Sequence, residues 1–128
     1  MKRTFENLYL SLYINEGILF AHFRGCGLPI TAAVAVELEN ARIGILQGEE
    51  MPMLVTAEKR VQFTFRALVY FARSERTAGI KTAAIVLEGR MVSFYARLFL
   101  RLRTKKHILI KTFPNREKAL EWLYTFYT

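Results

Sequence analysis

Two histidines and one cysteine are the residues of this 128-residue chain best suited to general-base or nucleophilic chemistry. A nucleophile needs a base within hydrogen-bond reach and donors that stabilise the developing oxyanion. His22 and His107 each lie in a stretch with the pattern of a strand, and neither stands in a catalytic spacing such as G-x-S-x-G. A histidine in a strand is more often a packed or surface residue than a catalyst, so the sequence favours a protein that is not an enzyme.

Cys26 lies between two glycines and is either an exposed reactive thiol or, more simply, a small residue in a tight turn. One cysteine cannot form an internal disulfide and is too few for a zinc site, which fits a reducing compartment. No H-x-x-x-H, C-x-x-C or EF-hand spacing is present. The turn at residues 25–27 also lacks the third glycine of G-x-G-x-x-G and the Gly-Lys-Ser/Thr of a P-loop. We therefore expect no metal ion and no cofactor.

Basic residues form a row along one expected helix, and the formal net charge of the chain is +8 at pH 7. Such a charge favours association with nucleic acid, an anionic membrane surface or an acidic protein. The row could bind the phosphates of nucleic acid or of lipid head groups. The alternative, which we favour, is the solvated outer face of a surface helix, because no aromatic platform of the RRM or OB type accompanies the row. This candidate anion patch consists of Arg90, Arg97, Arg101, Arg103, Lys105 and Lys106.

A central strand is predicted over residues 51 to 57. Leu54 and Val55 stand in a short unbroken apolar run, typical of a strand buried on both faces, and Pro52 fits its start. Polar residues follow at the carboxyl end of this strand, the edge of an open α/β sheet at which ligands and partners most often bind. We predict a docking loop from Thr56 to Thr64, whose candidate regulatory or docking residues are Thr56, Glu58, Lys59, Arg60 and Thr64.

Strands and helices are predicted to alternate on both sides of this central strand. Alternating apolar residues predict a strand over residues 7–14, and a turn then leads to a second strand over residues 18–23. Caps and helical spacing predict four helices, with two more strands between them. The helices cover residues 31–45, 64–74 (stopped by Gly79), 91–102 and 116–127, and the strands cover residues 80–87 and 107–113.

Apolar spacing predicts which side chains of these helices face the core. On the first helix, Glu39 and Arg42 lie away from the apolar side, and Val36 and Ile43 lie opposite it, either tucked under a loop or part of a partner surface. The inward residues of the four helices are, in order, Ile30, Val34, Leu38, Ala41 and Ile45; Phe65, Leu68, Val69 and Ala72; Met91, Phe94, Tyr95, Leu98 and Leu102; and Leu120, Leu123 and Tyr127.

The length and composition predict one globular domain over residues 1–128. An apolar content of 52%, with 10 Phe and 6 Tyr, is typical of a packed chain. No apolar stretch is long enough for a membrane span and no signal peptide is apparent, so we expect a cytoplasmic protein. The element order predicts an α/β fold with an N-terminal β-hairpin, then repeated α-β units, in a five-stranded, mostly parallel sheet with four helices.

Several short motifs lie between residues 38 and 127: Met-Pro-x-Leu-Val at 51–55, Ala67-x-x-Tyr70-Phe71-Ala72, Thr-Ala-Ala-Ile-Val at 82–86, Lys-Thr-Phe at 111–113 and Ala-Leu-Glu-Trp-Leu at 119–123. With these motifs the chain resembles an uncharacterised family of small bacterial STAS-like proteins. Members are similar in fold to anti-sigma-factor antagonists, and CRAL-TRIO lipid-exchange domains share the same run of strand-helix units. The resemblance implies this architecture in a bacterial cytoplasm, without an established activity.

The resemblance also directs attention to Thr64. Anti-sigma-factor antagonists carry a phosphorylatable serine in Asp-Ser-Ser-Gly at the start of the helix after the central strand. The corresponding residues here are Gln-Phe-Thr-Phe-Arg at 62–66, so only Thr64 could accept a phosphate, and a threonine there ordinarily caps a helix. The family usually has an acidic residue where this chain has Thr56, and an arginine near the position of Leu68.

Two hypotheses follow. The first is a non-enzymatic STAS-like module that binds a partner protein through the docking loop, with phosphate on Thr64 altering docking by local electrostatics. The second is an anion, lipid or nucleic-acid binder that uses the candidate anion patch and a pocket beneath residues 91–102. The exposed apolar pair Val36 and Ile43 also permits a homodimer.

Overall fold

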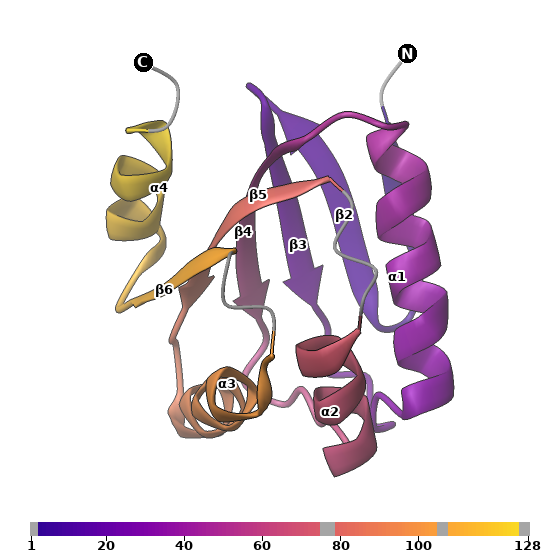
Figure 1. Cartoon of the computed structure of the whole chain (residues 1–128). Coiled ribbons are helices and arrows are strands. Elements are labelled where there is room, and N and C mark those ends of the chain that lie inside the picture. Colours follow the sequence, from indigo (N-terminus) through magenta and orange to yellow (C-terminus); the bar gives the residue numbers. More distant parts are fainter. Residues whose placement is uncertain (1–2, 75–78, 105–107, 126–128) are drawn as a thin grey trace.

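The computed structural model describes residues 3–74, 79–104 and 108–125, and that part of the chain forms one mixed sheet with helices on both faces (Figure 1). Six strands lie in the sheet in their order along the chain. The strands are β1 (Thr4–Glu6), β2 (Leu10–Asn15), β3 (Ile18–Phe23), β4 (Met51–Ala57), β5 (Ile80–Val86) and β6 (Leu109–Phe113), and the helices are α1 (Ala32–Leu46), α2 (Phe65–Arg73), α3 (Arg90–Leu102) and α4 (Arg116–Tyr124).

The sheet confirms the predicted central position of residues 51–57. Strand β4 pairs in parallel with β3 on one side and with β5 on the other. The N-terminal strands β1, β2 and β3 pair antiparallel, and β5 pairs in parallel with β6. The sheet is therefore mostly parallel with an antiparallel edge, as the element order predicted.

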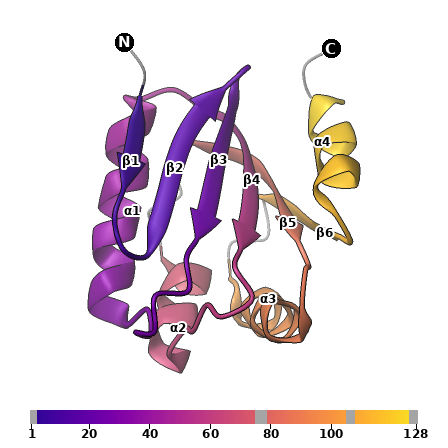
Figure 2. The ribbon, with the colours of Figure 1, turned by 180° about the vertical axis from the view of Figure 1, so that it is seen from behind.

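Two hydrophobic cores lie on opposite faces of the sheet. Helices α1, α2 and α3 cover one face, and Figure 2 shows the other face of β1 to β4 in front of α1 and α2. The second core joins Phe20, Leu54 and Val86 to Ala119 and Leu123 of α4. Burial on both faces explains the unbroken apolar runs in β4 and β5.

Local signals in the sequence mark where the helices begin and end. Thr31 precedes α1 and its Oγ1 accepts a hydrogen bond from the Val34 N–H at 3.3 Å, and Asn115 caps α4 in the same way through the Lys118 N–H at 2.9 Å. At the other end of α1, Gln47 and Gly48 both have positive φ, which stops the helix.

The first predicted strand was wrong in its start, and the sheet has six strands where five were expected. The Asn7 side chain accepts hydrogen bonds from the N–H groups of Tyr9 and Leu10, both at 2.9 Å. This turn takes residues 7–9 out of the strand and exposes Leu8. The preceding residues Thr4–Glu6 then pair with β2 as an additional edge strand.

The predicted helix faces were right in part: Leu38, Leu68 and Leu123 are buried as expected, but other residues were assigned to the wrong side. Glu39 and Arg42 are buried, with 7% and 6% exposure, whereas Phe65, Met91 and Phe94 are exposed. The fully buried residues of α2 and α3 are mostly small, and their larger apolar residues are half-buried or exposed. The fully buried residues are Ala67, Leu68, Ala72, Val92 and Ala96.

Two predicted helix ends also differ. Helix α2 ends at Arg73 with Ser74 as its C-cap, so Gly79, with φ +85°, precedes β5 and does not end the helix. Ile30 lies outside α1 and bridges to Phe63. His107 and Tyr127 lie outside the described residues.

Candidate functional site

The carboxyl ends of β3, β4 and β5 meet at one end of the molecule (Figure 1). We call this end the carboxyl rim: the loops 24–31, 58–64 and 87–89 with the first turns of α1, α2 and α3, which follow them. None of these three helices has an acidic residue in its first turn. The partial positive charges of the helix N-termini are therefore not compensated there by side chains of the same helices.

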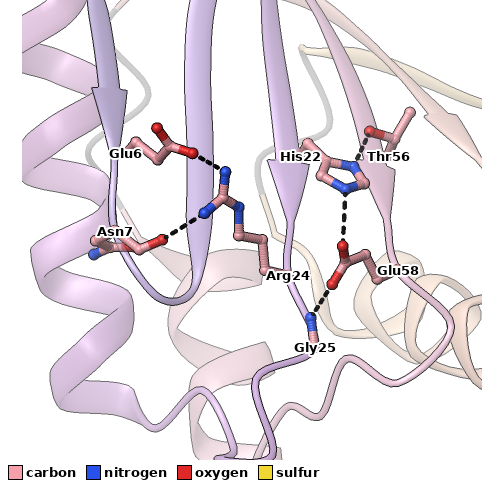
Figure 3. Close-up of polar contacts among 7 residues, drawn as sticks. All are labelled: Glu6, Asn7, His22, Arg24, Gly25, Thr56 and Glu58. Atoms are coloured by element: carbon pink, nitrogen blue, oxygen red, sulfur yellow. Dashed lines mark hydrogen bonds and ion pairs between the residues drawn. The ribbon is translucent and has the colours of Figure 1, made fainter.

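A polar cluster joins the ends of β3 and β4 (Figure 3). His22 and Thr56 are register partners on adjacent parallel strands, and His22 Nδ1 lies 2.8 Å from Thr56 Oγ1. The other ring nitrogen of His22 lies 3.7 Å from a Glu58 carboxylate oxygen, and the second oxygen of that carboxylate accepts the Gly25 N–H at 2.7 Å. Sequence reasoning missed this cluster, because only the strand register brings these residues together.

This cluster contains the residue types of a nucleophile, a base and an orienting carboxylate. The 3.7 Å contact between His22 and Glu58 is longer than an N–H···O hydrogen bond of about 2.7 to 3.2 Å, so the histidine is not fixed by it. The Gly25 N–H, a backbone donor beside the cluster, is already engaged by Glu58. This geometry suits a structural role: the cluster holds the loop after β4 against the end of β3.

A second polar contact fastens the N-terminal strands to the same edge. The Arg24 guanidinium pairs with the Glu6 carboxylate and donates to the Asn7 carbonyl oxygen at 3.3 Å (Figure 3). Arg24 follows β3, whereas Glu6 and Asn7 lie at the end of β1. The contact therefore positions the loop that leads from β3 to α1.

A shallow hollow of about 570 Å³ lies in the carboxyl rim, bounded by residues 25–27, residues 59–62 and Met91. Gly25 allows the backbone of loop 24–31 to lie close to that of loop 58–64, since a Cβ at position 25 would lie 2.7 Å from the Arg60 carbonyl carbon. Gly89 precedes α3 without a side-chain cap, so the first N–H groups of α3 face this end of the molecule without a capping oxygen. Lys59 and Arg60 add positive charge, and the hollow suits an acidic group.

Large apolar side chains are exposed along the carboxyl rim, and one of them, Met91, lines this hollow. Leu28, Phe65, Met91 and Phe94 lie in or beside the rim loops with 55%, 59%, 49% and 53% exposure. Single exposed apolar residues are common, but several at one end of a molecule are typical of a protein-binding surface.

The residues predicted for the docking loop lie partly on this surface. Glu58, Lys59 and Arg60 are exposed, whereas Thr56 is half-buried in β4. Thr64 is the N-cap of α2: its Oγ1 accepts the Ala67 N–H at 3.1 Å and donates to the Ile30 carbonyl at 3.4 Å. The Thr64 hydroxyl therefore has a structural role.

The candidate anion patch is divided by the structure. Arg90, Arg97 and Arg101 are exposed on α3, and no carboxylate of a described residue pairs with them. Arg103 is half-buried at the C-cap of α3 and donates to the Ile108 carbonyl at 2.9 Å. Lys105 and Lys106 lie outside the described residues.

The apolar pair predicted on the outer side of α1 is only partly accessible: Val36 is exposed and Ile43 is half-buried.

Two classes of site are not found in the described ranges. Residues 3–74, 79–104 and 108–125 contain no group of three or more His, Cys, Asp or Glu side chains that could hold a metal ion. No helix in these ranges has the length and apolar character needed to cross a membrane.

The fold is similar to a crystal structure described as an uncharacterized protein from the DUF3478 family with a SpoIIAA-like fold, from Shewanella loihica PV-4. The TM-score is 0.54 at 16% sequence identity, and the match covers 93% of this chain and 98% of that one. This likeness supports the STAS-like fold and nothing finer. No curated protein matches the chain. The model of a family described as a domain of unknown function, DUF7793, matches residues 12–127, and the chain belongs to that family.

Proposed function

We propose that this protein is a STAS-like regulatory module, without catalytic activity of its own, that binds an acidic segment of a partner protein at the carboxyl rim in a bacterial cytoplasm. The observation that carries the proposal is the hollow beside the uncapped N-terminus of α3, which has cationic residues on one side and an exposed methionine on the other. A carboxylate placed there would accept hydrogen bonds from free N–H groups and meet the positive end of the helix.

The charge of the surrounding residues favours an acidic partner. Lys59, Arg60, Arg66 and Arg90 are all exposed around the rim. The rim loops carry two carboxylates, exposed Glu88 and Glu58, which accepts the Gly25 N–H, so the exposed cations outnumber them. Complementary charge of this kind accelerates encounter and fixes orientation, while buried apolar anchors supply most of the affinity.

The apolar anchors are Phe65 and Met91. Each is the first or second residue of its helix, and each is about half exposed. Because each side chain is already about half buried, covering the exposed half on docking would stabilise a complex by about 0.7 to 1.5 kcal/mol each. The partner segment therefore combines acidic residues with at least one apolar residue.

Thr64 is the proposed regulatory residue of this surface. A phosphate there would replace the hydroxyl proton donated to the Ile30 carbonyl and would add negative charge at the N-terminus of α2. Because the partner segment is acidic, phosphorylation would weaken docking by repulsion.

Photo-crosslinking tests the location of the docking surface. A photoreactive phenylalanine analogue is placed at Phe65, and in a matched protein at Tyr124, which is exposed to a similar extent on α4. After irradiation in a lysate of the source organism, we expect a specific adduct from position 65 and none from position 124. The adduct is identified and the purified partner is used for binding measurements.

Binding of that purified partner then tests the chemistry. Arg60→Glu and Phe65→Ser are each expected to weaken the Kd at least about tenfold, a change of about 1.4 kcal/mol. Tyr124→Ser should leave it unchanged, and added salt should weaken wild-type binding more than Arg60→Glu binding. An adduct of equal yield from both positions, or a partner whose affinity ignores both rim substitutions, would refute the proposal.

A second candidate function rests on the exposed arginines of α3. Arg90, Arg97 and Arg101 have no carboxylate partner among the described residues, which favours binding of phosphate-rich molecules. Titration of duplex DNA and of phosphatidylserine vesicles separates the two sources of phosphate. Binding that weakens on Arg97→Ser and Arg101→Ser together would support this function; no binding of either probe at low salt would exclude it.

A further inference from the structure

An apolar cavity of about 200 Å³ lies between the sheet and the three helices α1, α2 and α3. It is separate from the hollow in the carboxyl rim: with the exception of Val61, the residues that line the two spaces differ. Side chains of β2 to β6 form its floor, and α3 forms much of its roof. The cavity therefore lies where a pocket was expected from the sequence, beneath residues 91–102.

Small residues on both walls leave this space open. Ala21, Ala57 and Ala83 line it from β3, β4 and β5, and Ala72 and Ala96 line it from α2 and α3. Larger side chains at the same positions would fill the gap between the layers. Protein interiors are normally packed to the density of organic crystals, so an unfilled apolar space of this size is a candidate binding site.

Aromatic rings enclose the end of the cavity nearest the carboxyl rim. Phe63 lies at the centre of this group, with ring centroids 5.2 Å from Phe23, 6.3 Å from Phe71 and 5.1 Å from Tyr95. All these pairs meet edge to face, and all four residues line the cavity. Edges and faces of aromatic rings attract a further ring in the same geometry.

Polar side chains line the opposite end, where α2 and α3 finish. Glu39 and Arg42 are buried there on α1, and the Ser74 hydroxyl donates to a Glu39 carboxylate oxygen at 2.9 Å. Arg103 completes this end at the C-cap of α3. The cavity therefore has an aromatic end and a charged end, which would give a bound molecule a preferred direction.

We infer that this cavity binds a compact, mainly apolar molecule that contains one aromatic ring, with any polar substituent directed to the charged end. An engineered apolar cavity of about 150 Å³ holds benzene, so the present volume has room for a ring with small substituents. Long-chain lipids and drug-sized compounds need more space, since their pockets span about 300 to 1,000 Å³. This binding activity is independent of partner docking at the carboxyl rim.

The test uses p-xylene as the probe and the whole chain as the receptor. Titration followed by ¹⁵N–¹H NMR is expected to give saturable shifts at the amides that line the cavity, and intermolecular NOEs to the methyl groups of Ala83 and Ala96. Ala96→Leu and, separately, Ala72→Leu place larger side chains in the cavity and should abolish the saturable shifts. Ala33→Leu makes the same change on the exposed face of α1 and should bind as wild type does.

The outcomes are decisive in both directions. Saturable shifts in wild type and Ala33→Leu that disappear in either folded cavity variant support the inference. No saturation by wild type up to the solubility of p-xylene would overturn it, as would unchanged binding by a folded Ala96→Leu or Ala72→Leu protein. Should both variants fail to fold, the wild-type NOEs decide: their absence at Ala83 and Ala96 overturns the inference, and their presence supports it.

Discussion

Replacing Thr64 by valine separates the structural role of this residue from its proposed regulatory role. The substitution keeps the shape of the side chain and removes the Oγ1 that accepts the Ala67 N–H at 3.1 Å. Loss of an N-cap threonine costs about 1 kcal/mol and at most about 2 kcal/mol. The second hydrogen bond, to the Ile30 carbonyl at 3.4 Å, is long and adds little. We therefore expect the free energy of unfolding to fall by about 1 kcal/mol, which lowers the Tm by about 4 °C for a domain of this size.

Urea denaturation followed by circular dichroism measures this change. Thr64→Ser keeps the hydroxyl and serves as the matched control, and Thr64→Asp introduces an equally good cap, so both should lie within about 0.5 kcal/mol of wild type. An unfolding free energy of Thr64→Val equal to that of wild type would refute the capping argument. A loss of equal size in Thr64→Ser would assign the effect to packing of the methyl group instead.

Three further predictions concern the second core, the hydrogen bond between His22 and Thr56, and Tyr124. Leu123→Ala should lower the free energy of unfolding by about 3 to 4 kcal/mol, because Leu123 is fully buried where α4 meets the sheet. The control Glu121→Ala, at an exposed position of α4, should change it by less than about 0.5 kcal/mol in the same urea titration. Thr56→Val removes the 2.8 Å hydrogen bond to His22 and should lower the free energy of unfolding by about 1 kcal/mol at pH 8. An unchanged free energy of unfolding would mean that this hydrogen bond does not stabilise the fold. Desolvation, then the hydrogen bond to Glu16 and the charge of Glu16, raises the pKa of Tyr124 above its ordinary value of 10.0, and NMR titration of the ring should show this pKa fall on Glu16→Gln. Since the folded-state pKa is raised, this contribution to stability is present below about pH 10 and is lost as the pH rises through the folded-state pKa.

The parts of the fold set by local chemistry could be predicted from the sequence. Strand β4 has the predicted bounds because Pro52 and a short apolar run define a buried strand. Thr31 and Thr64 cap their helices as expected, since a capping oxygen needs only an N–H three residues further along the chain. The extra strand β1 was missed because its three residues carry almost no periodicity and pair only through β2.

The candidate site depends on contacts between distant parts of the chain. His22 and Thr56 are 34 residues apart, and their contact exists because β3 and β4 align in one particular register. Periodicity predicts which residues share a face but not which residues of two parallel strands lie side by side. The cavity is hidden from sequence in a similar way, because alanines on five different elements leave space only when those elements pack together.

The burial of Glu39 and Arg42 shows why the inner face of α1 could be assigned only in part from its sequence, although Leu38 and Ile45 are buried as predicted. Apolar residues occur on all sides of this helix, so periodicity alone does not fix the side that meets the protein. Burying a charged side chain is costly unless it is hydrogen-bonded or paired. Ser74, at the end of α2 and 35 residues away in sequence, donates the hydrogen bond that offsets this cost for Glu39. The hydrogen bond from Ser74 therefore stabilises α1 in the orientation that its buried apolar residues also favour, and the same contact places a charged side chain at one end of an otherwise apolar cavity.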